Sequence, residues 1–411
     1  MVKNLTILVT TKKLSSQHST ISKQSYQSEN SKAMTKGRII IGANHGDCGK
    51  GTVVAYYTKN ANGKVLNILT NGGPQRGHTV VKNGEVFTFK HFGSGTCYGA
   101  STFFSKDFIV NPMQFVKEYK ELTQKQPMPQ IYMHRFCRWT TPYDILANQI
   151  IEENRQKYHE EHGSCGMGIW ETVLRCSKNY ILGFEEFART FPTNQKTYLK
   201  YVRGYFNTKY FDSFAGNAPK FEMTKEEREI WESDGLMEHF IDDCKFMFNH
   251  VKFTANIPGD FDEYIFENGQ GLLLNDDPDN VHTTPSVTGI GAVDSNDLYF
   301  INDLTVHYVT RPYLTRHGAG QFDETKRSEI SGDIKDDLMN HRNKFQGDFK
   351  YGYLDLNELK NRIDNDYKLN KVPGISSQIL EITHCDEMDR ESEFKKLFKN
   401  YHIFDKADLD G

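Results

Sequence analysis

Residues 38–54 read RIIIGANHGDCGKGTVV, and this stretch constrains the fold more than any other part of the chain. Three consecutive isoleucines predict a short strand that is buried on both faces, as in a parallel sheet. Glycines and Lys50 follow, and then a segment with the composition of a helix start. Backbone N–H groups at such a helix start bind phosphate, and the ammonium group of Lys50 adds a positive charge. The stretch therefore predicts a phosphate-binding loop between a parallel strand and a helix.

The spacing of this loop departs from the common pattern GxxxxGK[ST]. Asn44 stands at the first glycine of that pattern, and Gly51 follows the lysine. A structural glycine-rich turn is therefore the alternative to nucleotide binding. Asp47 also has two interpretations: it is a Mg²⁺ ligand or general base beside phosphates, or it is an ordinary turn residue.

Segments with strand character alternate with segments of helical periodicity over most of the chain. Further strands are predicted at residues 64–73, 84–92, 263–276 and 298–314. A long helix is predicted at residues 141–162, with Thr141 as its N-cap. Residues 180–255 combine aromatic and charged residues at helical spacing, which predicts a helical insertion. The predicted fold is α/β: a single large domain around a mostly parallel central sheet, with a P-loop-like nucleotide site and this helical insertion.

The first 36 residues differ in composition from the rest of the chain. They contain seven Ser and six Lys against a single Glu, and we expect residues 1–36 to form a disordered N-terminal extension. A start at Met34 and a transit peptide are the alternatives. The catalytic domain is then expected at residues 37–411.

Charge and cysteine content exclude several classes of protein. The net charge of −4 gives no reason to expect binding to nucleic acid or to a membrane surface. No apolar run approaches the roughly 20 residues of a membrane-spanning helix. The seven cysteines include no CxxC pair, which argues against a disulfide framework and a structural zinc site. These features together predict a cytoplasmic protein in a reducing compartment.

Three further glycine-rich loops carry polar side chains. Residues 71–81 (NGGPQRGHTVV) place His78 on a loop after a strand, where it suits an acid or a hydrogen-bond donor to phosphate. Residues 162–170 (HGSCGMGIW) offer hydroxyl and thiol groups between glycines, and residues 267–289 offer Gln270 and a Thr/Ser cluster. Taken alone, each loop is also explained by a turn or an exposed histidine. Four such loops together favour a large ligand site.

Seven motifs resemble those of the adenylosuccinate synthetases, the ligases of purine nucleotide biosynthesis. The family motif WGDEGKG resembles residues 45–51, and GGNNAGHTVV resembles residues 72–81. The other resemblances, in chain order, are GTTGRGIGP to 163–170, EGAQGTLLD to 267–275, YTTRVGAGPF to 313–322, TGWLD to 351–355 and LTKLD to 382–386. The motifs are collinear over most of the chain, which is therefore identified as a divergent member of this family.

The resemblance implies a two-step reaction. An aspartate removes the N1 proton of IMP, so that O6 attacks the γ-phosphate of a nucleoside triphosphate, with GTP expected and ATP as the alternative. A histidine donates a hydrogen bond or proton to that phosphate, and Mg²⁺ bridges the phosphates. The amino group of L-aspartate then displaces the 6-phosphoryl group and gives adenylosuccinate. Phosphorylation is needed because a 6-oxo group is a poor leaving group.

The motif positions also imply a role for each candidate residue. The catalytic residues are Asp47, Lys50 and His78. The nucleotide-binding residues are Gly46, Gly49, Gly51, Thr52, Gly77 and Asp386. The residues that bind the purine monophosphate are Gln75, Ser164, Cys165, Arg175, Gln270 and Thr284. Asp47 and Gly77 are the Mg²⁺ ligands, and Arg175 resembles the arginine that a homodimer partner contributes to the nucleotide phosphate.

Two departures from the family pattern bear on the choice of substrates. Residues 345–355 (FQGDFKYGYLD) contain no arginine, whereas the family has TTGRRRRTGWLD. A dicarboxylate substrate favours a bidentate guanidinium partner, so the identity of the amine donor stays open. The candidate residues of this amine-donor loop are Arg342, Gly347 and Lys350. His384 replaces the lysine of TKLD, while Asp386 is kept as an acceptor for guanine.

Three functions are compatible with these motifs. The first is ligation of IMP to aspartate. The second keeps the activation chemistry but uses another amine donor, or dGMP as in viral relatives that make 2-aminoadenine nucleotides. The third is an inactive, regulatory nucleotide-binding protein. The presence of Asp47, Lys50 and His78 favours an active enzyme, and Asp47 favours the first function because the viral relatives often replace this aspartate with a small residue.

Overall fold

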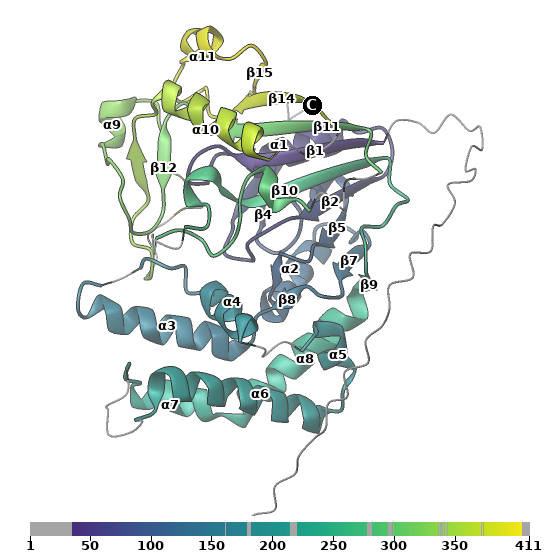
Figure 1. Ribbon diagram of the computed structural model, residues 1–411, viewed down its shortest axis with the longest axis vertical. Coiled ribbons are helices and arrows are strands. Elements are labelled where there is room, and N and C mark those ends of the chain that lie inside the picture. The colour runs from purple at the N-terminus through teal and green to yellow at the C-terminus, as the bar shows by residue number, and fades with distance from the viewer. Residues whose placement is uncertain are drawn as a thin grey trace, which may run out of the picture. The chain divides into compact units, whose positions relative to one another are not determined.

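The computed structural model describes residues 35–160, 162–178, 182–213, 220–277, 282–294, 298, 300–335, 337, 340, 342, 344–370, 372 and 374–404. A nine-stranded sheet runs through these residues (Figure 1). Its strands, in their order across the sheet, are β15 (Tyr401–Ile403), β14 (Ile375–Ile382), β11 (Asp303–Thr310), β1 (Lys36–Gly42), β10 (Glu263–Gly271), β2 (Val65–Leu69), β5 (Ser101–Phe104), β7 (Ile131–His134) and β9 (Lys252–Thr254). Each neighbouring pair is parallel, which confirms the predicted α/β fold.

Smaller strand pairs and helices complete the described elements. The pairs are β3 (His78–Lys82) with β4 (Glu85–Phe89), β6 (Ile109–Val110) with β8 (Arg138–Trp139), and β12 (Leu314–Arg316) with β13 (Lys350–Gly352). The helices are α1 (Lys50–Lys59), α2 (Pro112–Thr123), α3 (Pro142–Gln156), α4 (Ile169–Ser177), α5 (Phe184–Arg189), α6 (Pro192–Phe206), α7 (Lys225–Glu232), α8 (Asp234–His250), α9 (Arg327–Ile330), α10 (Leu356–Leu369) and α11 (Glu391–Leu397). Short helical turns are η1 (Ser94–Tyr98), η2 (Asn207–Phe211), η3 (Leu272–Leu274) and η4 (Ile290–Ala292).

The three isoleucines of β1 explain its central position. Ile39, Ile40 and Ile41 are fully buried. Ile40 packs on one face of the sheet with Val53 and Val54 of α1. Ile39 and Ile41 pack in a second cluster, which includes residues of α10. Both faces of the strand are covered, and this is why it is apolar throughout, as predicted.

Thr141 caps α3, as predicted. Its Oγ1 accepts a hydrogen bond from the backbone of Asp144 at 3.3 Å, and the carboxylate of Asp144 accepts one from the backbone of Thr141 at 2.7 Å. This reciprocal pair is a capping box. The helix ends at Gln156 rather than at residue 162, because the polar residues that follow form a turn.

The strands are shorter than the sequence pattern predicts. β2 ends at Leu69 instead of residue 73, and β10 ends at Gly271, where the chain passes into η3. β11 covers only the central part of the predicted strand 298–314. At the carboxyl ends of these strands the chain leaves the sheet, and candidate site residues lie in the segments that follow.

Four helices, α5–α8, lie between residues 184 and 250 and pack with one another and with α3 (Figure 1). Buried aromatic side chains such as Phe187, Phe206 and Trp231 fill the space between them. The range 180–255 also contains β9, which pairs with β7 at the edge of the main sheet. The N-terminal extension expected at residues 1–36 lies outside the described residues, except for residues 35 and 36.

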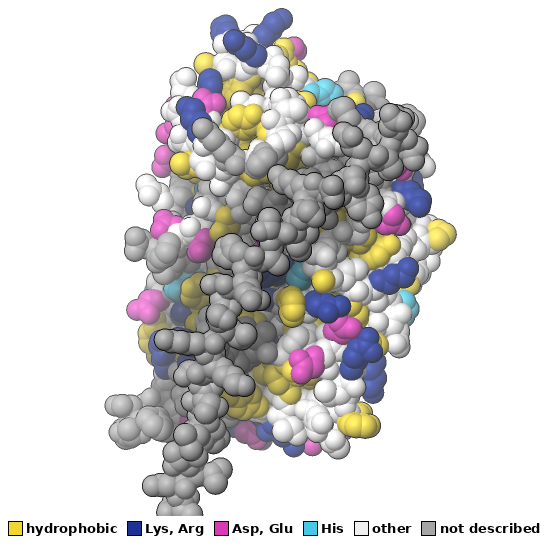
Figure 2. All heavy atoms as spheres, turned by 45° about the vertical axis from the view of Figure 1, so that its right-hand side comes forward, with side chains coloured by type: hydrophobic (Ala, Val, Ile, Leu, Met, Phe, Trp, Pro, Cys, Tyr) yellow, Lys and Arg dark blue, Asp and Glu magenta, His cyan; other side chains and the backbone are white. Residues whose placement is uncertain are grey.

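The described surface is mixed in charge. Among the described side chains on the face drawn in Figure 2, Lys and Arg are interspersed with Asp and Glu. None of the helices in the described part of the chain has both the length and the apolar character of a membrane-spanning segment.

The strand order brings distant loops to one edge of the sheet. Gly42 at the end of β1 is paired with Gly271 of β10 on one side and with Val309 of β11 on the other. The backbone N–H of Ala43 then donates to the carbonyl of Val309 at 2.9 Å. The loops after these three strands therefore start side by side at the carboxyl edge, where parallel α/β proteins bind their ligands.

Candidate active site

The phosphate loop, residues 43–49, connects β1 to α1. Its last residue, Gly49, has a φ of 82°, and a Cβ there would come within 2.9 Å of the Thr383 side chain; only glycine fits both conditions. Lys50 is the first residue of α1 and is 2% exposed. No side chain of the described residues caps this helix, so the N–H groups of its first turn are available to a phosphate.

Asp47 lies in this loop with a φ of 49°, which is uncommon for a residue with a side chain. Its carbonyl accepts a hydrogen bond from Nε of Arg311 at 2.6 Å. Its carboxylate has no hydrogen bond or ion pair with another described residue. Burial raises the pKa of Asp47, while Lys50 and Arg311 act in the opposite direction. A free carboxylate with a raised pKa suits a proton acceptor.

His78 begins β3 and packs against the start of α1. A Cβ on Gly51 would lie 3.0 Å from the Cβ of His78, so the close approach requires glycine. Nδ1 of His78 lies 2.5 Å from Oε1 of Glu267 in β10, and the hydroxyl of Ser94 donates to the same oxygen at 2.5 Å. The fully buried Glu267 thus orients the imidazole and leaves Nε2 as the ring nitrogen available to a ligand.

The pKa values of this pair show which form is stable without a ligand. Burial lowers the pKa of His78 to about 4, although Glu267 acts in the opposite direction. Burial alone would raise the pKa of Glu267, but Arg76 and His78 outweigh it and lower this pKa to about 2. At neutral pH the pair therefore consists of a neutral imidazole that donates its Nδ1–H to a carboxylate.

The other predicted nucleotide-loop residues accompany these groups. Gly46 has a φ of 125°, Thr52 lies in the first turn of α1, and the exposed Gly77 immediately precedes β3. The structure thus brings Asp47 and Lys50 together with His78 and the glycines around them.

Three residues predicted to bind the purine monophosphate carry a buried oxygen without a hydrogen-bond partner among the described residues: Gln75, Gln270 and Thr284. A Cβ on Gly72 would lie 2.9 Å from Nε2 of Gln75 and 3.6 Å from Nε2 of Gln270. Gly271 in turn packs against the phosphate loop, where a Cβ would meet the carbonyl of Asn44. Unpaired buried polar groups are costly, and these oxygens are available to a ligand in this region.

Ser164 and Cys165 lie in the loop between α3 and α4. The Ser164 hydroxyl donates to Oδ1 of Asn148 at 3.2 Å. Burial raises the pKa of the Cys165 thiol to about 11, so it is protonated at neutral pH. The loop thus offers neutral hydrogen-bonding groups rather than a reactive thiolate.

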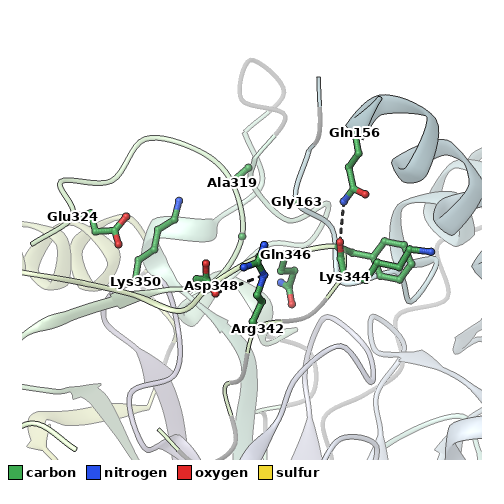
Figure 3. A pocket seen from close by; sticks show the side chains of 12 residues that line it. Gln156, Gly163, Ala319, Glu324, Arg342, Lys344, Gln346, Asp348 and Lys350 are labelled. Carbon is green, nitrogen blue, oxygen red and sulfur yellow. Dashed lines mark hydrogen bonds and ion pairs between the residues drawn. The ribbon is translucent and has the colours of Figure 1, made fainter. Parts of the chain in front are cut away.

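The same loop packs against the amine-donor loop. A Cβ on Gly163 would come within 2.3 Å of the backbone of Ala319, and one on Gly166 within 2.8 Å of the Phe345 ring. A cavity of about 730 Å³ opens beside these contacts (Figure 3). Its walls include all three predicted amine-donor residues, Arg342, Gly347 and Lys350.

The Arg and Lys side chains that line this cavity differ in their ion-pair partners. Nε of Arg342 lies 3.8 Å from Asp348, and Nζ of Lys344 lies 2.6 Å from Glu153. Lys350 has no ion-pair partner among the described residues. Its ammonium group is therefore the lining cation that remains available to an anionic ligand.

The segment after β14 reaches the phosphate loop. The hydroxyl of Thr383 donates to the carbonyl of Cys48 at 3.0 Å. His384 has a φ of 57°, and burial lowers its pKa to about 3. Asp386 is exposed, and Nζ of Lys335 lies 3.5 Å from its carboxylate. The segment that contains the predicted base-binding residue Asp386 thus contacts the phosphate loop through Thr383.

Arg175 is not brought to the surface of the site. The residue is 1% exposed, and its guanidinium donates to both oxygens of Asp144, at 2.8 and 3.0 Å, and to the carbonyl of Trp139 at 2.8 Å. In this arrangement it is enclosed by its own chain. The role of an arginine contributed to a second subunit and the homodimer both stay predictions.

Three charged residues around the site were missed by the sequence analysis. Arg311 stands directly after the end of the buried strand β11, and this position is a signal that could have identified it. Glu267 lies in the middle of β10. Arg362 in α10 donates to Oδ1 of Asn44 at 2.7 Å and also to the carbonyl of Ala43. Asn44 lies 318 positions from Arg362 in the sequence, so no local sequence pattern could have predicted this contact.

The protein has a parallel sheet, a phosphate loop after a central strand and polar loops beside it at the carboxyl edge. These features define an α/β nucleotide-binding protein. The model of the adenylosuccinate synthetase family matches residues 39–395. The chain therefore belongs to this family of C–N-forming ligases, which generally use Mg²⁺.

Known relatives are distant. The adenylosuccinate synthetase of Microcystis aeruginosa is 26% identical over 302 residues, which cover 72% of this chain and 63% of the relative. That of Buchnera aphidicola is 23% identical over 406 residues, covering 92% and 86%. The chain thus spans less than two thirds of the first of these relatives.

Two solved structures share the fold. The fully ligated adenylosuccinate synthetase of Plasmodium falciparum has a TM-score of 0.58 at 16% identity, covering 84% of this chain and 76% of that one. Succinoaminodeoxyadenylate synthetase of cyanophage S-2L, bound to dGMP and to dATP as an energy donor, has a TM-score of 0.56 at 10% identity, covering 90% and 91%.

Proposed function

We propose that this chain activates O6 of IMP with a nucleoside triphosphate, GTP, and joins the product to L-aspartate to give adenylosuccinate. The observation that carries the proposal is the position of Asp47, whose free carboxylate shares a loop with Lys50 and a helix start that binds phosphate. The unpaired oxygens of Gln75 and Gln270 support a purine monophosphate next to this loop.

In the first step Asp47 accepts the N1 proton of IMP, and the electron pair moves onto O6. O6 forms a bond to the γ-phosphorus while the bond from that phosphorus to the β–γ bridging oxygen breaks, so the nucleoside diphosphate leaves. Lys50 and the first N–H groups of α1 hold the phosphates. His78 donates a hydrogen bond from Nε2, because the phosphate charge and Glu267 both favour the protonated ring.

The residues present fit a Mg²⁺ ion. The free carboxylate of Asp47 and the carbonyl of Gly77 are hard oxygen donors of the kind that Mg²⁺ prefers, and substrate phosphates commonly complete such sites. When bound, the ion neutralises charge on the phosphates. Within the described residues no group of three or more His, Cys, Asp or Glu side chains is arranged to hold a metal, so the proposed ion depends on the nucleotide.

In the second step the amino group of L-aspartate attacks C6, and inorganic phosphate leaves with O6. We place the amine donor in the cavity next to residues 345–350. The ammonium of Lys350 pairs with one of its carboxylates, since Arg342 already faces Asp348.

The direct test incubates the protein with IMP, L-aspartate, Mg²⁺ and either GTP or ATP. Formation of N6-succinylpurine is followed by absorbance, and phosphate release is measured in parallel. We expect product with the wild-type protein and a rate about 10²- to 10⁴-fold lower for Asp47→Asn, as for loss of a general base. Absence of product with both donors would contradict the proposal.

A second candidate uses dGMP as the acceptor and ATP or dATP as the donor. The fold likeness to the cyanophage enzyme, which is bound to dGMP and dATP, favours it. An adenine donor also suits the surroundings of Asp386, because Nζ of Lys335 lies 3.5 Å from this carboxylate and competes with guanine for it. A panel of acceptors and donors, with product masses measured, distinguishes the two candidates.

A further inference from the structure

Arg76 is a buried cation that the proposed reaction does not use directly. The residue is 5% exposed, and it donates from Nε to the carbonyl of Lys90 at 3.2 Å and from Nη2 to that of Phe92 at 2.6 Å. Nη1 is buried and has no hydrogen-bond partner among the described residues. It lies 3.8 Å from Oε1 of Glu267. Because burying a guanidinium is costly, this placement calls for a reason.

The oxygen that Arg76 faces is the one that holds His78. Oε1 of Glu267 lies 2.5 Å from Nδ1 of His78 and 2.5 Å from the hydroxyl of Ser94. Arg76 and His78 are two positions apart in one loop, so this loop reaches Glu267 at two points. The enclosed Nη1 thus lies next to the carboxylate oxygen that contacts the imidazole.

The backbone of residues 90–92, which accepts hydrogen bonds from Arg76, is also bound by a second side chain. Glu118 in α2 is buried and accepts the N–H groups of residues 90, 91 and 92, at 3.1, 2.7 and 3.0 Å. Arg76 binds two carbonyls of the same segment. Ser94, two residues further on, donates through its backbone to Oε2 of Glu267 at 3.0 Å. The segment therefore forms a rigid support for the carboxylate and for the guanidinium.

We propose that Arg76 is a positioning residue for the phosphoryl transfer: it holds the carboxylate of Glu267 in place and thereby keeps the ring of His78 oriented toward the transferred group. This inference rests on the proposed function. The motif GGNNAGHTVV, which resembles residues 72–81, has alanine where this chain has Arg76. The presence of Arg76 therefore distinguishes this chain from the family motif.

The kinetic test compares Arg76→Met and Arg76→Lys with the wild-type protein. Arg189→Met is the matched control, because Arg189 is an exposed arginine of α5. We expect Arg76→Met to lower kcat for IMP-dependent phosphate release by about tenfold or more, as for other outer-shell partners, with KM for IMP changed less than about twofold. Arg76→Lys should recover part of kcat because it keeps the charge. Arg189→Met should match the wild type.

A second measurement needs no substrate. Nitrogen-15 NMR of histidine-labelled protein at one pH reports which ring nitrogen of His78 carries the hydrogen. We expect the Nδ1–H form in the wild type, and an added population of the other tautomer in Arg76→Met. If that variant does not fold, Arg76→Lys takes its place, with a smaller change in the same direction.

The outcomes separate the two proposals. Unchanged His78 signals together with an unchanged kcat in a folded Arg76 variant overturn the positioning role. A loss of kcat from Arg76→Met that is equally large in a His78→Ala background also overturns it, because the effect then does not pass through His78. If the wild-type protein releases no phosphate with IMP, the proposed function fails, while the NMR comparison still decides the role of Arg76.

Discussion

Arg175 in α4 and Asp144 in α3 form a two-point ion pair in the interior of the protein, with Nε 2.8 Å from Oδ1 and Nη2 3.0 Å from Oδ2. The same carboxylate completes the cap of α3 through Thr141. The pair therefore joins the start of one helix to the body of another. These two helices border the loop that carries Ser164 and Cys165, so the ion pair fixes the two helices between which this loop runs.

We expect Arg175→Met to lower the free energy of unfolding by about 3–5 kcal/mol, because removing one partner leaves a buried charge unpaired. KM for IMP should stay near the wild-type value in protein that remains folded. Denaturant titration and steady-state kinetics measure the two quantities, with Arg189→Met as the exposed control. A higher KM without a loss of stability would instead give Arg175 a role in ligand binding.

Gln270→Ala should raise KM for IMP with little change in kcat. One hydrogen bond contributes about 0.5–1.5 kcal/mol, which corresponds to a change of roughly 2- to 13-fold. Gln378→Ala is a matched control, because its Oε1 is also buried and unpaired but lines a separate cavity beside α10 and α11. An equal effect of both substitutions would show that the loss is general rather than local to the purine.

Lys350→Met should raise KM for L-aspartate, because it removes the lining cation that has no anionic partner among the described residues. A hydrogen bond to a charged group contributes about 1.5–3 kcal/mol, or roughly 13- to 160-fold in affinity. Lys344→Met is the control, since its ammonium is engaged by Glu153 at 2.6 Å. If only the control changes KM, the amine donor lies elsewhere in the cavity.

Gly51→Ala should lower kcat by displacing β3 from α1. The added Cβ would meet the Cβ of His78 at 3.0 Å and the carbonyl of Thr79 at 3.1 Å. Gly204→Ala in α6 is the control, because nothing in the described structure lies within 4 Å of its Cβ position, and alanine there should stabilise the helix by roughly 0.5–1 kcal/mol. Measurements of kcat and of the denaturant midpoint for the two variants test whether the close approach of β3 to α1 requires glycine at residue 51.

Glu171 should make stability depend on pH. Burial raises the pKa of this carboxyl from 4.5 to about 8, so between these values the folded state holds a proton that the unfolded state releases. The contribution of Glu171 to the free energy of unfolding should therefore fall as pH rises through this interval, by at most about 1.4 kcal/mol per pH unit.

Glu171→Gln should remove that contribution, so its slope should differ from that of the wild type, and it should be more stable than the wild type near pH 8. Denaturant titrations at several pH values between about 5 and 8 measure this. Glu229→Gln, at an exposed position of α7, should leave the slope unchanged. An unchanged slope in Glu171→Gln would mean that Glu171 is ionised in the folded protein.

Local signals predicted the central unit of the fold. Three isoleucines and a glycine loop identified β1, the phosphate loop and α1. Burial of a strand on two faces and an uncapped helix start each produce a sequence pattern within a few residues. The pairing of His78 with Glu267 spans 189 positions, and nothing in either segment indicates it. Arg175 shows the opposite case: the motif assigned it to a ligand, but Asp144, 31 positions earlier, determines where its guanidinium lies.

The order of the strands along the chain also determines at what stage of synthesis the site can be complete. Asp47 and Arg311 are 264 positions apart, although one hydrogen bond joins them. During synthesis the phosphate loop leaves the ribosome long before β10 and β11, the strands on either side of β1. The hydrogen bond between Arg311 and the phosphate loop therefore forms only after Arg311 has emerged from the ribosome. A product terminated before that residue retains the phosphate loop but lacks one wall of its site.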